Sequence, residues 1–107
     1  MLDRLDGDQA FLNELLVMFR SDAPLSLKSA EDCLRSNDLP GLSRAAHAIK
    51  GMLRNLAMHN AAELADALEK CSGASRAENC ERHLLELKTA LERVLRVVES
   101  HLAGAHA

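Results

Sequence analysis

A histidine, a lysine and a glycine lie close together on one face of a predicted helix near the middle of this 107-residue chain. The helix follows a start signal at Asp38-Leu39-Pro40, and its apolar stripe consists of Leu42, Ala45, Ala46, Ile49, Met52, Leu53 and Leu56. At about 100° per residue, His47 lies about 160° from the mean direction of that stripe, so we expect its imidazole to face solvent. Lys50 follows three residues later, within reach of a group bound to the ring.

Gly51 is the third member of this face. A glycine in mid-helix costs about 0.5–1 kcal/mol relative to alanine, which indicates a role other than stability. Helical side chains lean toward the N-terminus, so a larger residue at this position would crowd the imidazole of His47. We therefore expect the glycine to leave the ring uncovered.

These three residues fit phosphoryl transfer, which needs an in-line nucleophile, clear access and positive charge near the transferred oxygens. An exposed imidazole is largely unprotonated and nucleophilic near neutral pH, and Lys50 can offset the charge of a phosphoryl group. No Asp or Glu lies beside His47 on the wheel of its own helix, so a hydrolase triad is not predicted. Ser43, Arg44 and Arg54 share the face and are candidates for docking a partner, although an ordinary solvated face explains the two arginines equally well.

Composition favours a small all-α domain. Apolar residues make up 48% of the chain and aromatic residues only 2%, so the core must consist mainly of Leu, Ala, Val and Met, as in helical bundles. The length suits one domain, residues 1–107, and leaves no room for a separate ATP-using kinase domain. Its three cysteines (Cys33, Cys71 and Cys80) are interpreted as reduced core thiols, and no metal site is predicted.

Charge and hydropathy limit the partners and the location. The net charge is only -3 and the two signs are interspersed, so nucleic acid is not a predicted partner. No apolar stretch approaches the about 20 residues that span a bilayer, and the N-terminus lacks the features of a signal peptide. We expect a cytoplasmic domain without membrane contact of its own.

Apolar stripes and start signals predict the helices that position this face. The first is a helix over about 8–21 capped by Asp8, and the second is opened by Pro24 and ends near Ser36-Asn37. The helix of His47 follows as the third. After a turn at His59-Asn60, a fourth helix spans about 61–72, and a long last helix runs from about Cys80 to Val98. Short connections favour an antiparallel up-down four-helix bundle with an additional short N-terminal helix. The tail, residues 103–107, is predicted to be disordered.

The segment Ala46-His47-Ala48-Ile49-Lys50-Gly51, followed by Asn55-Leu56-Ala57, resembles the H-x-x-K-G signature of histidine-containing phosphotransfer (HPt) domains. The resemblance covers nearly the whole chain, because residues 5–8 with 11–19 and residues 64–69 also look like the family's helices before and after the histidine. It implies that His47 accepts a phosphoryl group, on the ring nitrogen farther from the backbone, and passes it between receiver-domain aspartates of a two-component phosphorelay. Lys50 would then steady the phosphoryl oxygens, and Gly51 would admit the partner.

The same resemblance implies a monomeric phosphocarrier without ATP-dependent kinase activity of its own. It implies no cofactor for this chain, since the magnesium ion belongs to the partner receiver domain. A free-standing domain and the C-terminal module of a hybrid sensor histidine kinase, itself membrane-bound, both remain open. The family usually has small residues after the motif glycine and a glycine at the later small position, where this chain has Met52, Leu53 and Ala57; these departures leave the spacing of two helices open.

Two other interpretations compete with phosphotransfer. One is a structural helical bundle that binds a partner through an apolar surface, for which His47 is incidental. The other is metal binding by the remaining histidines (His59, His83, His101 and His106) with the cysteines, which their unpaired spacing disfavours.

Overall fold

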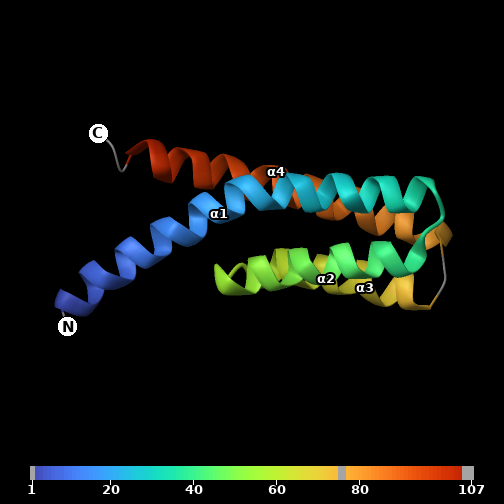
Figure 1. Ribbon diagram of the computed structural model, residues 1–107, viewed down its shortest axis with the longest axis horizontal. Coiled ribbons are helices and arrows are strands. Elements are labelled where there is room, and N and C mark those ends of the chain that lie inside the picture. The colour runs from blue at the N-terminus through green and yellow to red at the C-terminus, as the bar shows by residue number, and fades with distance from the viewer. Residues whose placement is uncertain (1, 75–76, 105–107) are drawn as a thin grey trace.

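The computed structural model describes residues 2–74 and 77–104, with side chains described for residues 9–74 and 78–104, and it contains four helices and no strand in these ranges. The helices are α1 (Leu2–Arg35), α2 (Leu39–Asn55), α3 (His59–Gly73) and α4 (Ala77–Gly104). Each runs antiparallel to the one before it, and α1 and α4 lie on one side of the bundle with α2 and α3 on the other (Figure 1). The predicted all-α, up-down four-helix bundle is confirmed.

The N-terminal part of the prediction needs correction, because the additional short helix is not a separate element. The chain is helical from Leu2 to Arg35, so Asp8 lies inside α1 rather than capping it, and Pro24 lies within the same helix rather than opening a new one. Pro24 removes one backbone hydrogen bond and clashes with the preceding turn, which costs about 3 kcal/mol in a helix interior.

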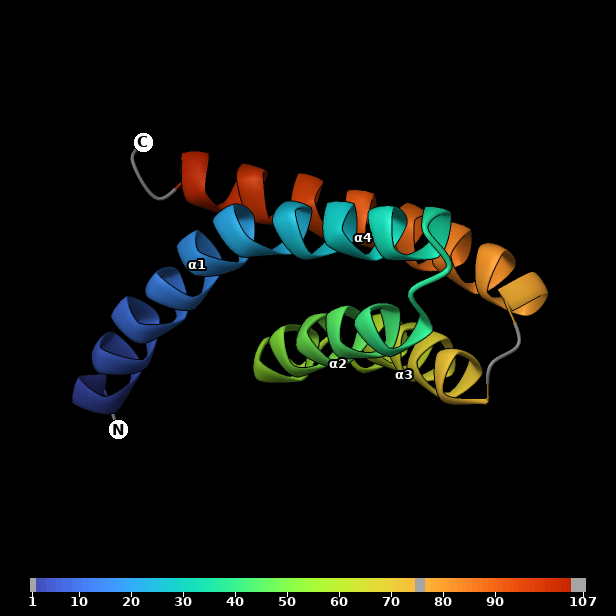
Figure 2. The same ribbon diagram turned by 45° about the vertical axis from the view of Figure 1, so that its right-hand side comes forward.

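Burial explains why α1 continues through the proline. One buried stripe runs along the helix on both sides of Pro24 and consists of Leu16, Phe19, Ala23, Leu27 and Ala30. Each of the three large side chains in it contributes about 1.5–3 kcal/mol, which together exceeds the cost of the proline. The helix continues through Pro24 instead of ending, and its N-terminal part diverges from the bundle in Figures 1 and 2.

The connection from α1 to α2 agrees with the predicted start of a helix at Asp38. Asn37 adopts a left-handed conformation (φ 60°), and the backbone N–H of Asp38 donates to the carbonyl of Cys33 at 2.7 Å, which closes α1. The Asp38 carboxylate then accepts a hydrogen bond from the backbone N–H of Gly41 at 3.0 Å. This confirms Asp38 as the N-cap of α2.

Helix α2 ends in the same way, but with an alanine at the left-handed position. Ala57 has φ 59°, its N–H donates to the carbonyl of Arg54, and the N–H of Met58 donates to that of Leu53. Only glycine adopts this conformation without cost; another residue loses roughly 1 kcal/mol there. The turn thus lies at residues 56–58, and His59 and Asn60, where the sequence predicts it, are the first residues of α3.

The core lies between the four helices and accommodates the two large residues that follow Gly51. Leu53 is fully buried, Met52 packs against the same cluster from its edge, and the small side chains of Ala61, Ala62 and Ala65 are buried on α3. Cys71 and Cys80 are buried in the core, Cys33 is half-buried and packs against it, and no disulfide joins these three residues. Burial and a hydrogen bond to Cys71 raise the pKa of Cys80 to about 11.

Helix α4 continues further toward the C-terminus than the sequence predicts. The predicted disordered tail is wrong for Ala103 and Gly104, which are the last residues of α4, and residues 105–107 lie outside the described part. In the part that the structure describes, no helix combines the length and apolar character needed to cross a membrane.

Candidate functional site

The outward face of α2 carries the histidine, as its wheel position predicts. Ala46 and Ile49, on either side in sequence, are fully buried, whereas the side chain of His47 is 70% exposed. Helical periodicity therefore turns the imidazole into solvent while its neighbours anchor the helix in the core. The ring is not isolated, however, because its Nδ1 lies 3.0 Å from Oε2 of Glu69 on α3.

The contact with Glu69 decides which ring nitrogen can react. The nearby Lys50 and, to a smaller extent, His47 lower the pKa of Glu69, so the carboxylate is ionised near neutral pH and can only accept a hydrogen bond. Nδ1 must then carry the proton in this contact. In the neutral ring, Nε2 is left with a lone pair, and it is the nitrogen farther from the backbone.

No role for Glu69 is predicted from the sequence. A helical wheel shows only the neighbours of His47 on its own helix, whereas Glu69 comes from the adjacent antiparallel helix, 22 residues later. A signal was present in the spacing of α3, because Asp66 and Glu69 each directly follow a buried position, Ala65 and Leu68. Charged residues that border an apolar stripe at a spacing of three lie beside the neighbouring helix and can pair with its side chains.

Lys50 is less exposed than its position on the helical wheel predicts, and it already has ion-pair partners. Only 13% of its side chain is exposed, and its Nζ lies 2.6 Å from Glu69 Oε1 and 3.2 Å from Asp66 Oδ1. The hydrogen bond with Glu69, followed by the one with Asp66, raises the pKa of Lys50, so the ammonium stays charged.

The ion-pair network ends at Lys70. Its Nζ lies 2.9 Å from Asp66 Oδ2, one turn along α3, and 78% of its side chain is exposed. Hydrogen bonds from Lys70 and then from Lys50 lower the pKa of Asp66. Two carboxylates on α3 are thus balanced by two lysines, one of them on the helix of His47.

Gly51 lies where no contact with the described residues requires a glycine. Its backbone is not at positive φ, and a Cβ added to it would have no side-chain or tertiary neighbour within 4 Å. The imidazole, turned toward Glu69, is therefore not crowded by a small residue at position 51 in this arrangement. The open space lies on the outside of α2, where a docking partner would approach.

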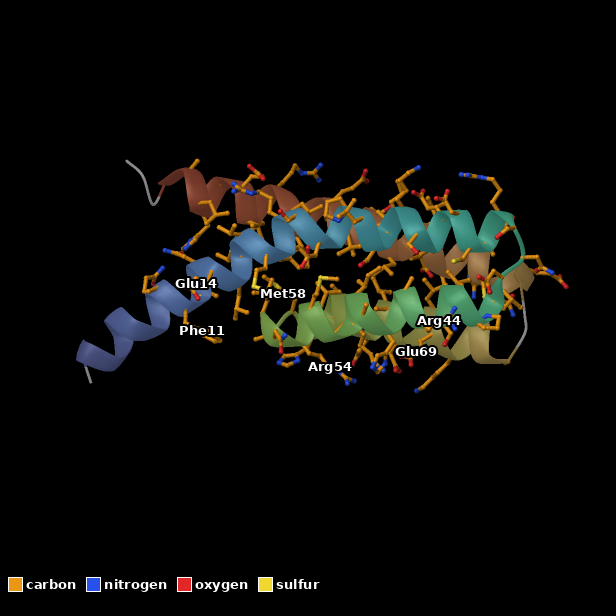
Figure 3. The ribbon with its side chains drawn as sticks, in the orientation of Figure 1. Phe11, Glu14, Arg44, Arg54, Met58 and Glu69 are labelled. Carbon is orange, nitrogen blue, oxygen red and sulfur yellow. The ribbon has the colours of Figure 1, made fainter. Side chains whose placement is uncertain are left out.

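The three candidate docking residues lie on α2, the helix of Gly51. Arg44 and Arg54 are exposed and Ser43 is half-buried. The arginines are ten residues apart, about 15 Å along the axis of α2, and Glu69 is labelled between them in Figure 3. Among the described residues neither arginine forms an ion pair, so both guanidinium groups are available to a partner.

The remaining histidines lie apart from this network. His83 approaches Glu86 on its own helix (3.6 Å), His101 contacts Gln9 of α1 (3.4 Å), and His106 lies outside the described residues. Within residues 2–74 and 77–104, no three His, Cys, Asp or Glu side chains are arranged to hold a metal ion.

The family model of the Hpt domain matches residues 14–97, most of the chain and all of the site. The chain therefore belongs to the Hpt domain family, whose members transfer phosphoryl groups through a histidine and interact with receiver domains in phosphorelays. Comparison with curated proteins and with solved structures gave no match.

Proposed function

We propose that this domain relays a phosphoryl group between receiver-domain aspartates through a phosphohistidine at Nε2 of His47. The observation that carries the proposal is the state of the imidazole, which is exposed on one side and held at Nδ1 by Glu69 on the other. Such a contact fixes the orientation and the tautomer of the ring without covering the reactive nitrogen.

The transfer needs no base from this chain. The Nε2 lone pair attacks phosphorus, the bond from phosphorus to the receiver's aspartate oxygen breaks, and that carboxylate leaves with the bonding electrons. Nδ1 keeps its proton throughout, so the ring becomes a cation that Glu69 stabilises through the 3.0 Å contact. Lys50 supplies positive charge three residues from the nucleophile, and we assign Gly51 the role of admitting the receiver's active site.

The partner completes the site. The receiver domain brings its aspartate and the magnesium ion that offsets charge on the phosphoryl oxygens, and we propose Arg44, Arg54 and Ser43 as docking residues for it. We further propose a monomeric, cytoplasmic phosphocarrier that does not use ATP itself, either free-standing or as the cytoplasmic module of a hybrid histidine kinase.

A matched pair of histidine variants tests the proposal. A purified receiver domain is labelled with ³²P, freed of its small-molecule donor and mixed with the wild type, with His47→Gln or with His59→Gln. The wild type and His59→Gln, which changes an exposed histidine at the start of α3, should both take up label. His47→Gln should keep the wild-type circular dichroism and take up none; normal labelling of this variant would refute the proposal.

A structural interaction module remains the second candidate because α1 exposes large apolar side chains. Phe11, Met18 and Leu25 are each more than half exposed. Such a module would bind its partner equally well with glutamine at position 47, so the same variant distinguishes the two functions.

A further inference from the structure

Among the described residues, the carboxylate of Asp66 forms ion pairs only with lysines. One of its oxygens contacts Lys50 at 3.2 Å and the other contacts Lys70 at 2.9 Å, whereas the carboxylate that reaches the ring of His47 is that of Glu69. Asp66 therefore influences the reacting nitrogen through Lys50.

A phosphoryl group on His47 would compete with the present partners of Lys50 for its ammonium group. Its ammonium group has three hydrogens, lies mostly out of solvent and is held by two carboxylates. The contact with Glu69 is the shorter one, at 2.6 Å, and Glu69 is itself fixed by His47. The contact with Asp66 is longer and is the one that Lys50 gives up most easily.

Lys70 makes this exchange possible. When Lys50 turns toward a phosphoryl group, Lys70 still neutralises Asp66 from one turn away on α3. When the phosphoryl group leaves, Asp66 again offers Lys50 a partner.

We propose that Asp66 is a positioning residue that competes with the phosphoryl group for Lys50 and thereby favours transfer of the group from His47 to a receiver. The inference rests on the proposed function and concerns the regulation of the same site. In the outward step the bond from Nε2 to phosphorus breaks, a bond from a receiver carboxylate oxygen to phosphorus forms, and the electron pair returns to Nε2. Lys50 returns to Asp66 still protonated, so no proton is transferred.

The expected size of the change in phosphoryl distribution follows from the partial exposure of the ion pair between Asp66 and Lys50. Partly exposed ion pairs contribute modestly, so losing the competitor should shift the equilibrium ratio of phosphorylated domain to phosphorylated receiver toward His47 by about two- to fivefold. Asp66→Asn removes the competing charge with almost no change in shape. Glu63→Gln is the matched control, because Glu63 lies one turn earlier on α3, is exposed and has the same charge.

The experiment measures the equilibrium distribution of ³²P between the domain and a receiver domain that exchanges phosphoryl groups with the wild type. The variants are Asp66→Asn, Glu63→Gln, Lys50→Met and the double variant Asp66→Asn/Lys50→Met, each checked for folding by urea unfolding. We expect Asp66→Asn to raise the ratio of phosphohistidine to receiver phosphoaspartate about two- to fivefold over that of Glu63→Gln. In the Lys50→Met background the same change should have no effect, because Lys50 is the group through which Asp66 acts.

Each other result overturns the inference in an identifiable way. An equal effect of Asp66→Asn and Glu63→Gln would show that only the overall charge matters. An effect of Asp66→Asn that persists in Lys50→Met would show that Asp66 acts on the phosphoryl group without the lysine. If the wild type is not labelled on His47, the proposed function fails and this inference with it; normal wild-type labelling with an unchanged Asp66→Asn equilibrium refutes the inference alone.

Discussion

Replacing Gly51 with alanine should stabilise the protein and impair it as a phosphotransfer partner. The glycine has no positive φ, and an added Cβ has no side-chain or tertiary neighbour within 4 Å, so alanine fits the folded chain without strain. Alanine also loses less conformational freedom on folding, which is worth about 0.5–1 kcal/mol in a helix interior. For 107 residues unfolding with about 2.1 cal/mol/K per residue, the midpoint should rise by about 2–4 °C.

The same methyl group should hinder docking. It projects into the open space on the outer face of α2, beside the nucleophile, where overpacking an interface costs about 1–3 kcal/mol. The lower end of that range, about 1 kcal/mol, corresponds to an about fivefold slower transfer from a phosphorylated receiver. The assay pairs thermal unfolding, followed by circular dichroism at 222 nm, with the initial rate of ³²P transfer.

Gly73→Ala is the matched control for Gly51→Ala, since Gly73 is the last residue of α3 and a Cβ there is equally free of neighbours. It should keep the wild-type transfer rate. A lower unfolding midpoint for Gly51→Ala would show that the fold itself needs this glycine. A wild-type transfer rate for Gly51→Ala and also for the larger Gly51→Leu would refute the claim that a partner uses the space.

Three further predictions concern the fold and the ion-pair network. Ala57→Gly should raise the free energy of unfolding in urea by about 1 kcal/mol, because glycine removes the strain of the left-handed conformation. Gly41→Ala should lower it by about 1–3 kcal/mol, because the new methyl group collides with the Asp38 carboxylate that caps α2. Asp66 and Glu69 have folded pKa values below their ordinary 3.8 and 4.5, so their stabilisation is present above these values and is lost as the pH falls through the folded ones. Between pH 7 and pH 3, the free energy of unfolding in urea should therefore fall less for Glu69→Gln than for the wild type.

Each of these predictions has a result that would contradict it. A destabilised Ala57→Gly would mean that the gain in freedom of the unfolded chain outweighs the relief of strain. An unchanged Gly41→Ala would mean that the cap and its surroundings shift without cost. An acid dependence of Glu69→Gln equal to that of the wild type would show that the contacts of Glu69 with His47 and Lys50 add nothing to stability.

The sequence predicts best those helices in which the buried residues recur at a single helical spacing. The stripe of α2 places His47 outward and Ile49 inward, and both positions are confirmed. The cap at Asp38 is also confirmed, because an aspartate before Leu-Pro-Gly acts within four residues. Local spacing was sufficient for these features.

The failures share a physical cause, which is that partners outside the local window decide the outcome. A proline with capping residues before it predicts a new helix at Pro24, but the stripe around Phe19 and Leu27 is buried by the other helices and keeps α1 continuous. The contacts of Glu69 and Asp66 with α2 likewise depend on the packing of two antiparallel helices. Single-helix wheels do not contain that information.

All the candidate site residues lie between Ser43 and Lys70, within the hairpin that α2 and α3 form. The candidate site thus lies on one contiguous stretch of chain. Helices α1 and α4 contribute no group to it and support it by packing against α2 and α3. Their outer faces can change sequence, or take on contacts of their own, without altering the reacting groups, provided that the inner faces still cover α2 and α3. Grafting residues 39–73 onto another pair of long helices with the same inner faces would transfer the site as a unit.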